Sequence, residues 1–383
     1  PMNLIFDNPS VLKPGFGTPS AQSMMTVFSA WSAAQVAVMK FIYSNPHKYT
    51  RVLAPWFNMI NTFLFGGLTQ HGEMVGNVCA DINGMGGGAL ADRDGEHGCA
   101  PIFATMSDLG EQEFIEEEMP FIQIVSKQMM KDNQGFGKQR GGMGYQMILA
   151  MRDSVACGFM LTAMRAKFPN VPGLFGGYGC PTYPLARVSG VNVFEILKND
   201  PGSFRYSIEE LLNERPFPDA VYSTHPMTLG YTLAQRGELY MIAQGTGGGF
   251  GDPLDRAPAD VIRDLDEGLL SHDVAWRIYR VVYDRENLHV DEAATQEART
   301  ALRRERISCS KPFEEFCKNW VKDKPSDKVP YYGSWDDKTM VHAGSSDKLH
   351  PAGQVVPPVV MAHPMQVKID KLEAELAACR KKA

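Results

Sequence analysis

Two short stretches of the chain place histidine beside carboxylates, the side chains that most often act as acid-base catalysts or metal ligands. In the first stretch, His71 and Glu73 precede Asp81. The second stretch contains Asp92, Asp94, Glu96 and His97. Neither has the HExxH spacing that is typical of a metal site, so solvated loops are the favoured interpretation. No metal site is assigned to this chain, and the candidates for catalysis are His71, Asp81 and His97.

A run of glycines from Gly245 to Gly251 comes before an expected helix. Such a run can hold phosphate through backbone N–H groups at a helix start. A P-loop would continue with Gly-Lys-Ser/Thr, whereas Asp252 follows here and would repel phosphate. We therefore favour a tight turn in which the backbone passes close to another segment. The alternative is contact with a ligand or partner, through Gly245, Gly247, Gly249 and Asp252.

A second glycine-rich loop, residues 135–144, carries two cations, Lys138 and Arg140. Cations among glycines can hold an anion such as a carboxylate or bicarbonate. The alternative interpretation, which we favour, is a solvated hairpin tip. Lys138 and Arg140 therefore join the candidate contacts with substrate or partner.

The chain has 383 residues, with 38 basic and 44 acidic side chains and a formal net charge of -6. Its hydrophobic content of 44% is that of a folded globular protein. Nucleic acids and anionic membranes attract proteins through clustered Lys and Arg, and no such stripe is present. We therefore expect neither kind of partner.

Glycine and charge divide the sequence into three parts. We expect a glycine-rich core domain with mixed or antiparallel β structure at 1–250, a charged helical segment at 251–321, and an extended proline-rich arm with a short C-terminal helix at 322–383. Alternating strand and helix signals are absent, so the expected class is α+β and a doubly wound parallel sheet is disfavoured.

Local signals mark individual elements within these parts. The apolar residues at 120–130 predict a strand. Helices are expected to begin at Pro258, after Ser271, after Asp291 and near Pro312, because proline and short polar side chains favour helix starts.

The uncharged run at 21–39 has nearly the length of a membrane span, but it includes several Ser and Gln side chains that lipid could not satisfy. A buried helix of a soluble protein is favoured. The seven cysteines are scattered without a CxxC pair, which is typical of a reducing compartment. The first residues show no signal peptide. We therefore expect a cytoplasmic protein.

The string Gly-Gly-Gly-Phe-Gly-Asp-Pro-Leu-Asp-Arg at 247–256, with the apolar pattern after it, resembles the C-terminal signature of the hydantoinase B family. The Gly-Lys-Gln-Arg-Gly-Gly loop at 137–142 resembles a second family motif. The family includes N-methylhydantoinase and 5-oxoprolinase subunits and the large subunits of acetone and acetophenone carboxylases. Segments at 290–295, 303–306, 311–316 and 331–335 resemble the ketone carboxylases more than the hydantoinases.

The resemblance implies an ATP-dependent, biotin-independent ketone carboxylase, a ligase that joins acetophenone or acetone to bicarbonate. The alternatives are an ATP-dependent cyclic-amide hydrolase of the 5-oxoprolinase type and a non-catalytic structural subunit. The family's histidine-rich metal motif is not found here, so the chain resembles the C-terminal half of such a protein, encoded separately or cleaved.

The same resemblance implies which partners and cofactors are needed. ATP and Mg²⁺ are expected on a hydantoinase A-like partner subunit, and a divalent metal on a chain carrying the N-terminal hydantoinase B half. The resemblance is also compatible with a small accessory subunit in the complex. The isolated chain is expected to be inactive.

Overall fold

The computed structural model describes residues 23–56, 61–79, 84–99, 119–162, 166–226 and 228–320, together with 340–342 and residues 372, 373 and 375. Most of the predicted arm at 322–383 therefore lies outside the described residues. The limits of the three predicted parts stay a prediction.

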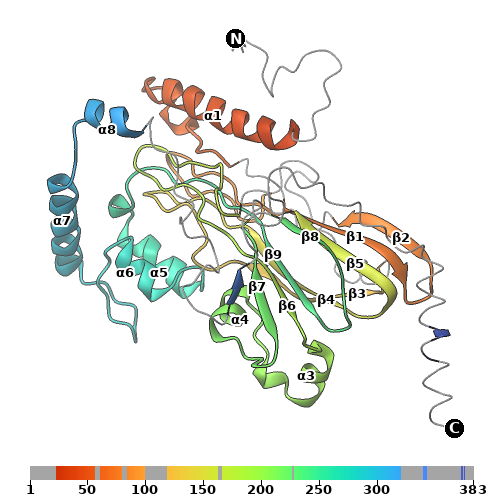
Figure 1. Ribbon diagram of the computed structural model, residues 1–383. Helices are drawn as coiled ribbons and strands as arrows, with labels where there is room; N and C mark the ends of the chain where they lie inside the picture. The colour runs from red at the N-terminus through yellow and green to blue at the C-terminus, as the bar shows by residue number, and fades with distance from the viewer. Residues whose placement is uncertain are drawn as a thin grey trace, which may run out of the picture.

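The described strands form two sheets (Figure 1). The four-stranded sheet has the order β2-β1-β5-β8, and the six-stranded sheet has the order β10-β7-β6-β9-β4-β3. Their strands are β1 (Thr62–Thr69), β2 (Met74–Cys79), β3 (Ile122–Met129), β4 (Tyr145–Met151), β5 (Ser154–Thr162), β6 (Leu185–Ser189), β7 (Val221–Thr224), β8 (Thr228–Leu233), β9 (Leu239–Ala243) and β10 (Met340–His342). All pairings are antiparallel except that of β10 with β7. The expected α+β class with antiparallel sheets is confirmed, and β3 forms where a strand was predicted.

The six-stranded sheet is buried on both faces because its side chains alternate between two cores. On β6, Leu185 packs with Phe63 and Phe159 of the four-stranded sheet. Its neighbour Ala186 packs on the other side. That second core is covered by two short helices, α3 (Val193–Asn199) and α4 (Ile208–Glu214). The region predicted as a β core therefore also contains helices.

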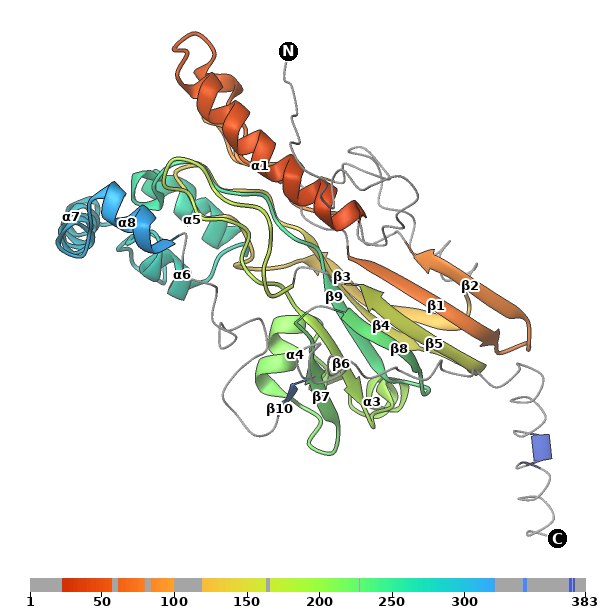
Figure 2. The ribbon, with the colours of Figure 1, turned by 45° about the horizontal axis from the view of Figure 1, so that its top comes forward.

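The charged segment folds into the helices that the sequence predicted. They are α5 (Pro258–Asp266), α6 (His272–Arg277), α7 (Glu292–Ser308) and α8 (Phe313–Trp320), preceded by the 3-10 turn η3 (Pro253–Asp255). Ser271 accepts a hydrogen bond from the N–H of Val274, and Asp291 accepts one from Ala294, so both predicted caps are confirmed. These helices gather at the end of the molecule opposite the β1–β2 hairpin (Figure 2).

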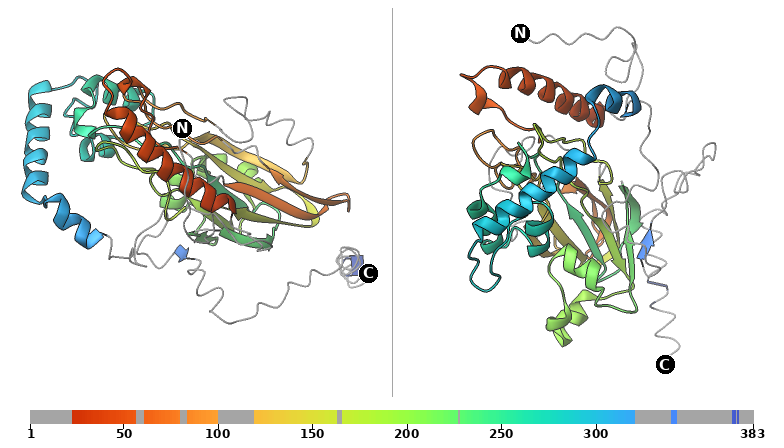
Figure 3. Two further views of the ribbon diagram at one scale, coloured as in Figure 1. Left: turned by 90° about the horizontal axis from the view of Figure 1, so that it is seen from above. Right: turned by 90° about the vertical axis from the view of Figure 1, so that its left-hand side faces the viewer.

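The uncharged run predicted as a buried helix is α1 (Ser23–Tyr43), which lies along one side of the molecule outside the sheets (Figure 3). Its inner side is held by Gln35, whose Nε2 donates to the carbonyls of Leu53 and Ala54 at 3.3 and 3.2 Å. Trp31 is 56% exposed and Phe41 78% exposed. The expected buried helix is therefore only partly buried, because among the described residues one side of α1, with Val36, Met39 and Ile42, packs against a core. Among the described helices, none has the length and hydropathy to cross a bilayer.

Candidate functional site

Three glycine-rich segments, residues 84–88, 135–144 and 245–251, pack against one another through their backbones; we call them the glycine junction. Gly86 N–H donates to Gly245 O at 3.1 Å, Gly142 N–H to Gly87 O at 2.7 Å, and Gly247 N–H to Gly142 O at 3.2 Å. A Cβ atom on Gly247 would lie 1.8 Å from Gly87 O. Glycine is therefore required here because the backbones touch. Whether Gly245, Gly247 and Gly249 also contact a ligand or partner stays a prediction.

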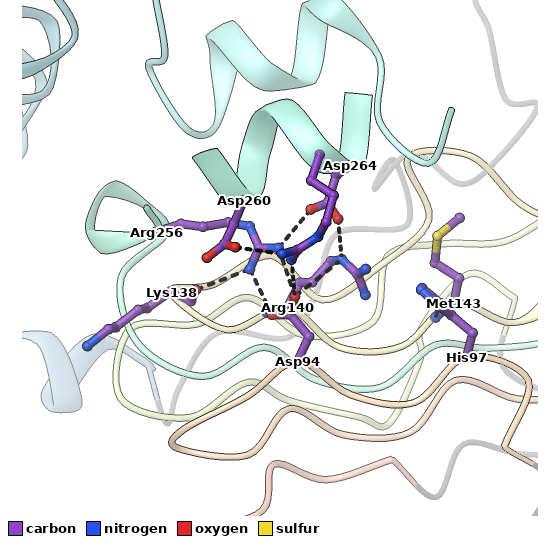
Figure 4. A network of polar contacts seen from close by, with 9 residues as sticks. Asp94, His97, Lys138, Arg140, Met143, Arg256, Asp260 and Asp264 are labelled. Carbon is purple, nitrogen blue, oxygen red and sulfur yellow. Dashed lines mark hydrogen bonds and ion pairs between the residues drawn. The ribbon is translucent and has the colours of Figure 1, made fainter. Parts of the chain in front are cut away.

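A buried network of arginine and aspartate joins the junction to the helical segment (Figure 4). Arg256 follows η3 and donates to both carboxylate oxygens of Asp94, at 2.7 and 2.8 Å. It also donates to Asp264 of α5 at 2.8 Å. Arg140 donates through Nε to Asp264 at 3.0 Å and through its backbone N–H to Asp94 at 2.8 Å. We call these four residues the Arg–Asp network.

The network is electrically balanced, with two guanidinium groups facing two carboxylates. Arg256 and Asp264 are fully buried. Burial by itself would raise the pKa of the Asp94 carboxyl, but its hydrogen bonds and charge interaction with Arg256 outweigh burial and lower it. The same contacts raise the pKa of Arg256 although burial opposes this. Asp94 and Arg256 are therefore both charged at neutral pH.

Arg140 uses only part of its hydrogen-bonding capacity in this network. The residue is 5% exposed, and its Nη1 atom is buried without a partner. Within the described part of the chain, neither terminal nitrogen of Arg140 donates a hydrogen bond. In Figure 4 the terminal end of the guanidinium is turned away from Asp264, toward the side where His97 and Met143 lie.

His97 is held in one orientation by the backbone of Met143. Its Nδ1 accepts a hydrogen bond from Met143 N–H at 3.0 Å, and the N–H of Gly98 donates to Met143 O at 2.9 Å. Burial, and then the positive charge of Arg140, lowers the pKa of His97 to about 4. The ring is thus neutral at pH 7, and because Nδ1 is an acceptor, the ring proton is on Nε2.

The other predicted side chains do not join this network, although the backbone carbonyl of Lys138 accepts a hydrogen bond from Arg256 at 3.2 Å. His71 is exposed in the turn between β1 and β2, at the opposite end of the molecule from α5 (Figure 2). Asp81 lies outside the described residues. The side chain of Lys138 is exposed and points away from the network (Figure 4). Asp252 accepts a hydrogen bond from Leu254 N–H at 2.9 Å and pairs with Arg306 at 3.0 Å.

The structure therefore brings together His97 and Arg140 of the predicted candidates, and adds Asp94, Arg256 and Asp264. Asp264 was missed as a site residue. The sequence did contain an indication of its role. Asp264 comes three positions after Val261, on the apolar side of the predicted helix, and a carboxylate buried there needs a charged partner. In the described ranges, no group of three His, Cys, Asp or Glu side chains is placed to hold a metal ion.

Three known proteins are similar to this chain in sequence. The acetophenone carboxylase delta subunit of Aromatoleum aromaticum is 29% identical over 335 residues, which is 87% of this chain and 48% of that protein. The acetone carboxylase alpha subunit of Xanthobacter autotrophicus is 27% identical over 76% of this chain and 38% of its own length. The caprolactamase subunit beta of Pseudomonas jessenii is 31% identical over 66% and 39%. The chain thus spans half or less of the length of these relatives.

A solved structure of acetone carboxylase in its nucleotide-free form has the same fold, with a TM-score of 0.67 and 24% identity. The match covers 79% of this chain and 40% of that one. The family model for hydantoinase B/oxoprolinase matches residues 1–253, about two thirds of the sequence. The chain belongs to the hydantoinase B/oxoprolinase family.

Proposed function

We propose that this chain is one subunit of an ATP-dependent, biotin-independent ketone carboxylase that joins acetophenone or acetone to bicarbonate, forming a 3-oxo acid. The extent of the sequence similarity carries the proposal. The similarity to the acetophenone carboxylase subunit covers 335 residues, whereas the family model ends at residue 253. An alignment of that length must include residues after 253, which lie outside the match to the family model.

The second candidate is an ATP-dependent cyclic-amide hydrolase. The caprolactamase subunit has the higher identity, 31%, but over only 256 residues. That length is close to the 253 residues of the family model. The similarity to the caprolactamase subunit therefore supports membership of the family. It is weaker support for hydrolysis than the longer carboxylase alignment is for carboxylation.

The proposed reaction needs groups that stabilise negative charge on oxygen. A ketone that gains carboxylate passes through an enolate or a phosphorylated enol, and activated bicarbonate is a carboxyphosphate. N–H donors held in a buried, preorganised site stabilise such oxygens best. Arg140 and His97 supply donors of that kind at the glycine junction, which in this proposal completes the cavity for the ketone and bicarbonate.

ATP and Mg²⁺ are assigned, in this proposal, to a hydantoinase A-like partner subunit. The divalent metal is assigned to the part of the relatives that this sequence does not cover. The Arg–Asp network supports this division, because both oxygens of Asp94 and of Asp264 already accept hydrogen bonds from arginine. The junction therefore offers N–H donors to substrate instead of carboxylate ligands to a metal.

The test is a substrate comparison with the assembled complex. The chain is purified with its partner subunits, and ATP turnover is measured with acetophenone or acetone in the presence and absence of bicarbonate. Parallel assays use caprolactam, 5-oxoproline and hydantoin. We expect turnover that needs both ketone and bicarbonate. Turnover with the cyclic amides alone would assign the complex to the hydrolases instead.

A further inference from the structure

The guanidinium of Arg140 is a charged group of the glycine junction that is buried and only partly hydrogen-bonded. Its Nε donates to Asp264, so the side chain cannot swing to another partner without losing that bond, and its backbone N–H is bound separately to Asp94. The terminal N–H groups are left with no acceptor in the described structure, and Nη1 is fully buried. Buried donors in folded proteins are almost always bonded, so this end is expected to meet a ligand or water.

The shape of the free end limits what can bind. A guanidinium presents two parallel N–H groups in one plane, the arrangement that matches the two oxygens of a carboxylate or of bicarbonate. The carboxylates nearest to Arg140 do not fill this position, because Asp94 and Asp264 are also held by Arg256. The ligand must therefore come from outside the network.

His97 lies on the side toward which the end of Arg140 is turned (Figure 4). It is near enough that, after burial, the charge of Arg140 lowers the pKa of His97, and it can supply a third donor. With Nδ1 accepting from Met143, the ring presents Nε2–H, and this atom has no hydrogen-bond partner within the described ranges. A neutral ring donates without bringing another charge. Since Arg140 is already balanced by aspartate, the site suits a monoanion better than a phosphate dianion.

We propose that the terminal nitrogens of Arg140 and Nε2 of His97 form a binding site for a small planar oxyanion. Naming bicarbonate as the physiological ligand rests on the proposed carboxylase function. A cyclic-amide hydrolase would present a carboxylate product with the same planar chemistry. The proposed site is defined by its N–H donors, so it does not depend on whether the ligand is bicarbonate or a carboxylate product.

The variants separate two roles of His97: donation from Nε2 to the ligand, and acceptance by Nδ1 of the hydrogen bond from Met143 N–H. His97→Asn keeps an oxygen close to the position of Nδ1, where it can accept from Met143 N–H, and removes the donor at the far end of the ring. Arg140→Lys keeps the positive charge and removes the two parallel N–H donors of the guanidinium. Arg93→Ala removes an exposed cation from the same loop and is the control for net charge.

The assembled complex, without ATP, is titrated with ¹³C-bicarbonate and with ¹³C-acetate, and binding is followed by NMR. We expect both probes to bind, with affinity about tenfold weaker in His97→Asn and weaker still in Arg140→Lys, and unchanged in Arg93→Ala. Thermal unfolding of each variant is measured in parallel. His97→Asn is expected to melt like the unmodified chain, so its weaker binding cannot come from unfolding.

Turnover then identifies the source of the ligand. If the KM for bicarbonate rises in His97→Asn while the KM for ATP stays the same, the ligand is bicarbonate; tight binding of acetate without bicarbonate assigns the site to a carboxylate product. The proposal is overturned if neither probe binds the unmodified complex, or if His97→Asn binds both as well as the unmodified chain does. Because binding is measured without turnover, a complex that fails to carboxylate ketones would refute the proposed function and leave this site intact.

Discussion

Arg256 and Asp94 are joined by two parallel hydrogen bonds, of 2.7 and 2.8 Å, across 162 residues of sequence. Asp94 lies in the loop that also carries His97, and Arg256 lies two residues before the start of α5. The pair therefore fixes the position of the His97 loop relative to the helical segment. Because Asp94 also accepts from the backbone N–H of Arg140, it links the His97 loop to the loop that carries Arg140, and these are the two loops of the proposed oxyanion site.

Replacing Asp94 with Asn should destabilise the fold by about 3 kcal/mol, because a fully buried Arg256 would lose half of its charge compensation. Urea unfolding at pH 7 measures the change. Asp92→Asn is the control: this exposed carboxylate has only a 3.9 Å ion pair with Arg93, and its loss should cost less than about 1 kcal/mol. Equal stability of the two variants would show that the Arg–Asp network does not hold the fold together.

The glycine junction should not tolerate even one added methyl group. In Gly247→Ala the new Cβ would lie 1.8 Å from Gly87 O, and the obstructing atoms belong to the backbone, so no side chain can move aside. We expect a loss of about 3 kcal/mol or more in the free energy of unfolding.

Gly230→Ala is the matched control for this substitution, because a Cβ at Gly230 meets nothing within 4 Å. It should leave stability unchanged or raise it slightly by restricting the unfolded chain. Both variants are compared by thermal unfolding of the full chain. If the Gly247→Ala chain unfolds at the same temperature as the Gly230→Ala chain, the close packing at Gly247 is contradicted.

Features that depend on neighbouring residues could be predicted from the sequence. The starts of α6 and α7 follow from Ser271 and Asp291, because a cap is a bond between residues three positions apart. The order of strands in the two sheets could not be predicted. It depends on pairings such as that of β1 with β5, between residues about 90 positions apart, and many orders satisfy the same alternation of apolar residues.

The candidate site shows the same division between local and distant information. The Gly-rich loop with Arg140 was recognisable from its composition, whereas the orientation of His97 depends on Met143 and on Gly98, whose φ of 60° turns the chain. His71 stood in as good a local pattern as His97, yet it lies in an exposed turn. Residue type alone does not report which polar cluster the fold will bury.

The cap of α7 offers a small and well-defined test of the helical segment. Asp291 is exposed and accepts a hydrogen bond from Ala294 N–H at 2.9 Å. Asp291→Ala should cost about 1 kcal/mol of stability, whereas Asp291→Ser, which keeps a capping oxygen, should cost only a few tenths. Urea unfolding followed by circular dichroism measures both. Equal losses in the two variants would show that this hydrogen bond does not stabilise α7.

Acid should destabilise the fold through the buried histidine His225, which follows β7 and is 9% exposed. Burial, and then the charge of Arg187, lowers its pKa from 6.5 to about 4. Between pH 6.5 and pH 4 the unfolded chain therefore binds a proton at this residue that the folded chain does not. Stability from this group is complete above pH 6.5 and is lost as the pH falls toward 4.

From pH 7 to pH 5 the contribution of His225 should decrease by about 2 kcal/mol, because each pH unit inside the window is worth about 1.4 kcal/mol. His225→Leu cannot bind the proton, so its free energy of unfolding should change less between these pH values than that of the unmodified chain. Urea unfolding at both pH values measures the difference. His97 keeps its own pH dependence in both chains, since its pKa is also lowered to about 4, and it therefore cancels in the comparison. If His225→Leu and the unmodified chain lose the same stability between pH 7 and pH 5, His225 is not held neutral by the fold.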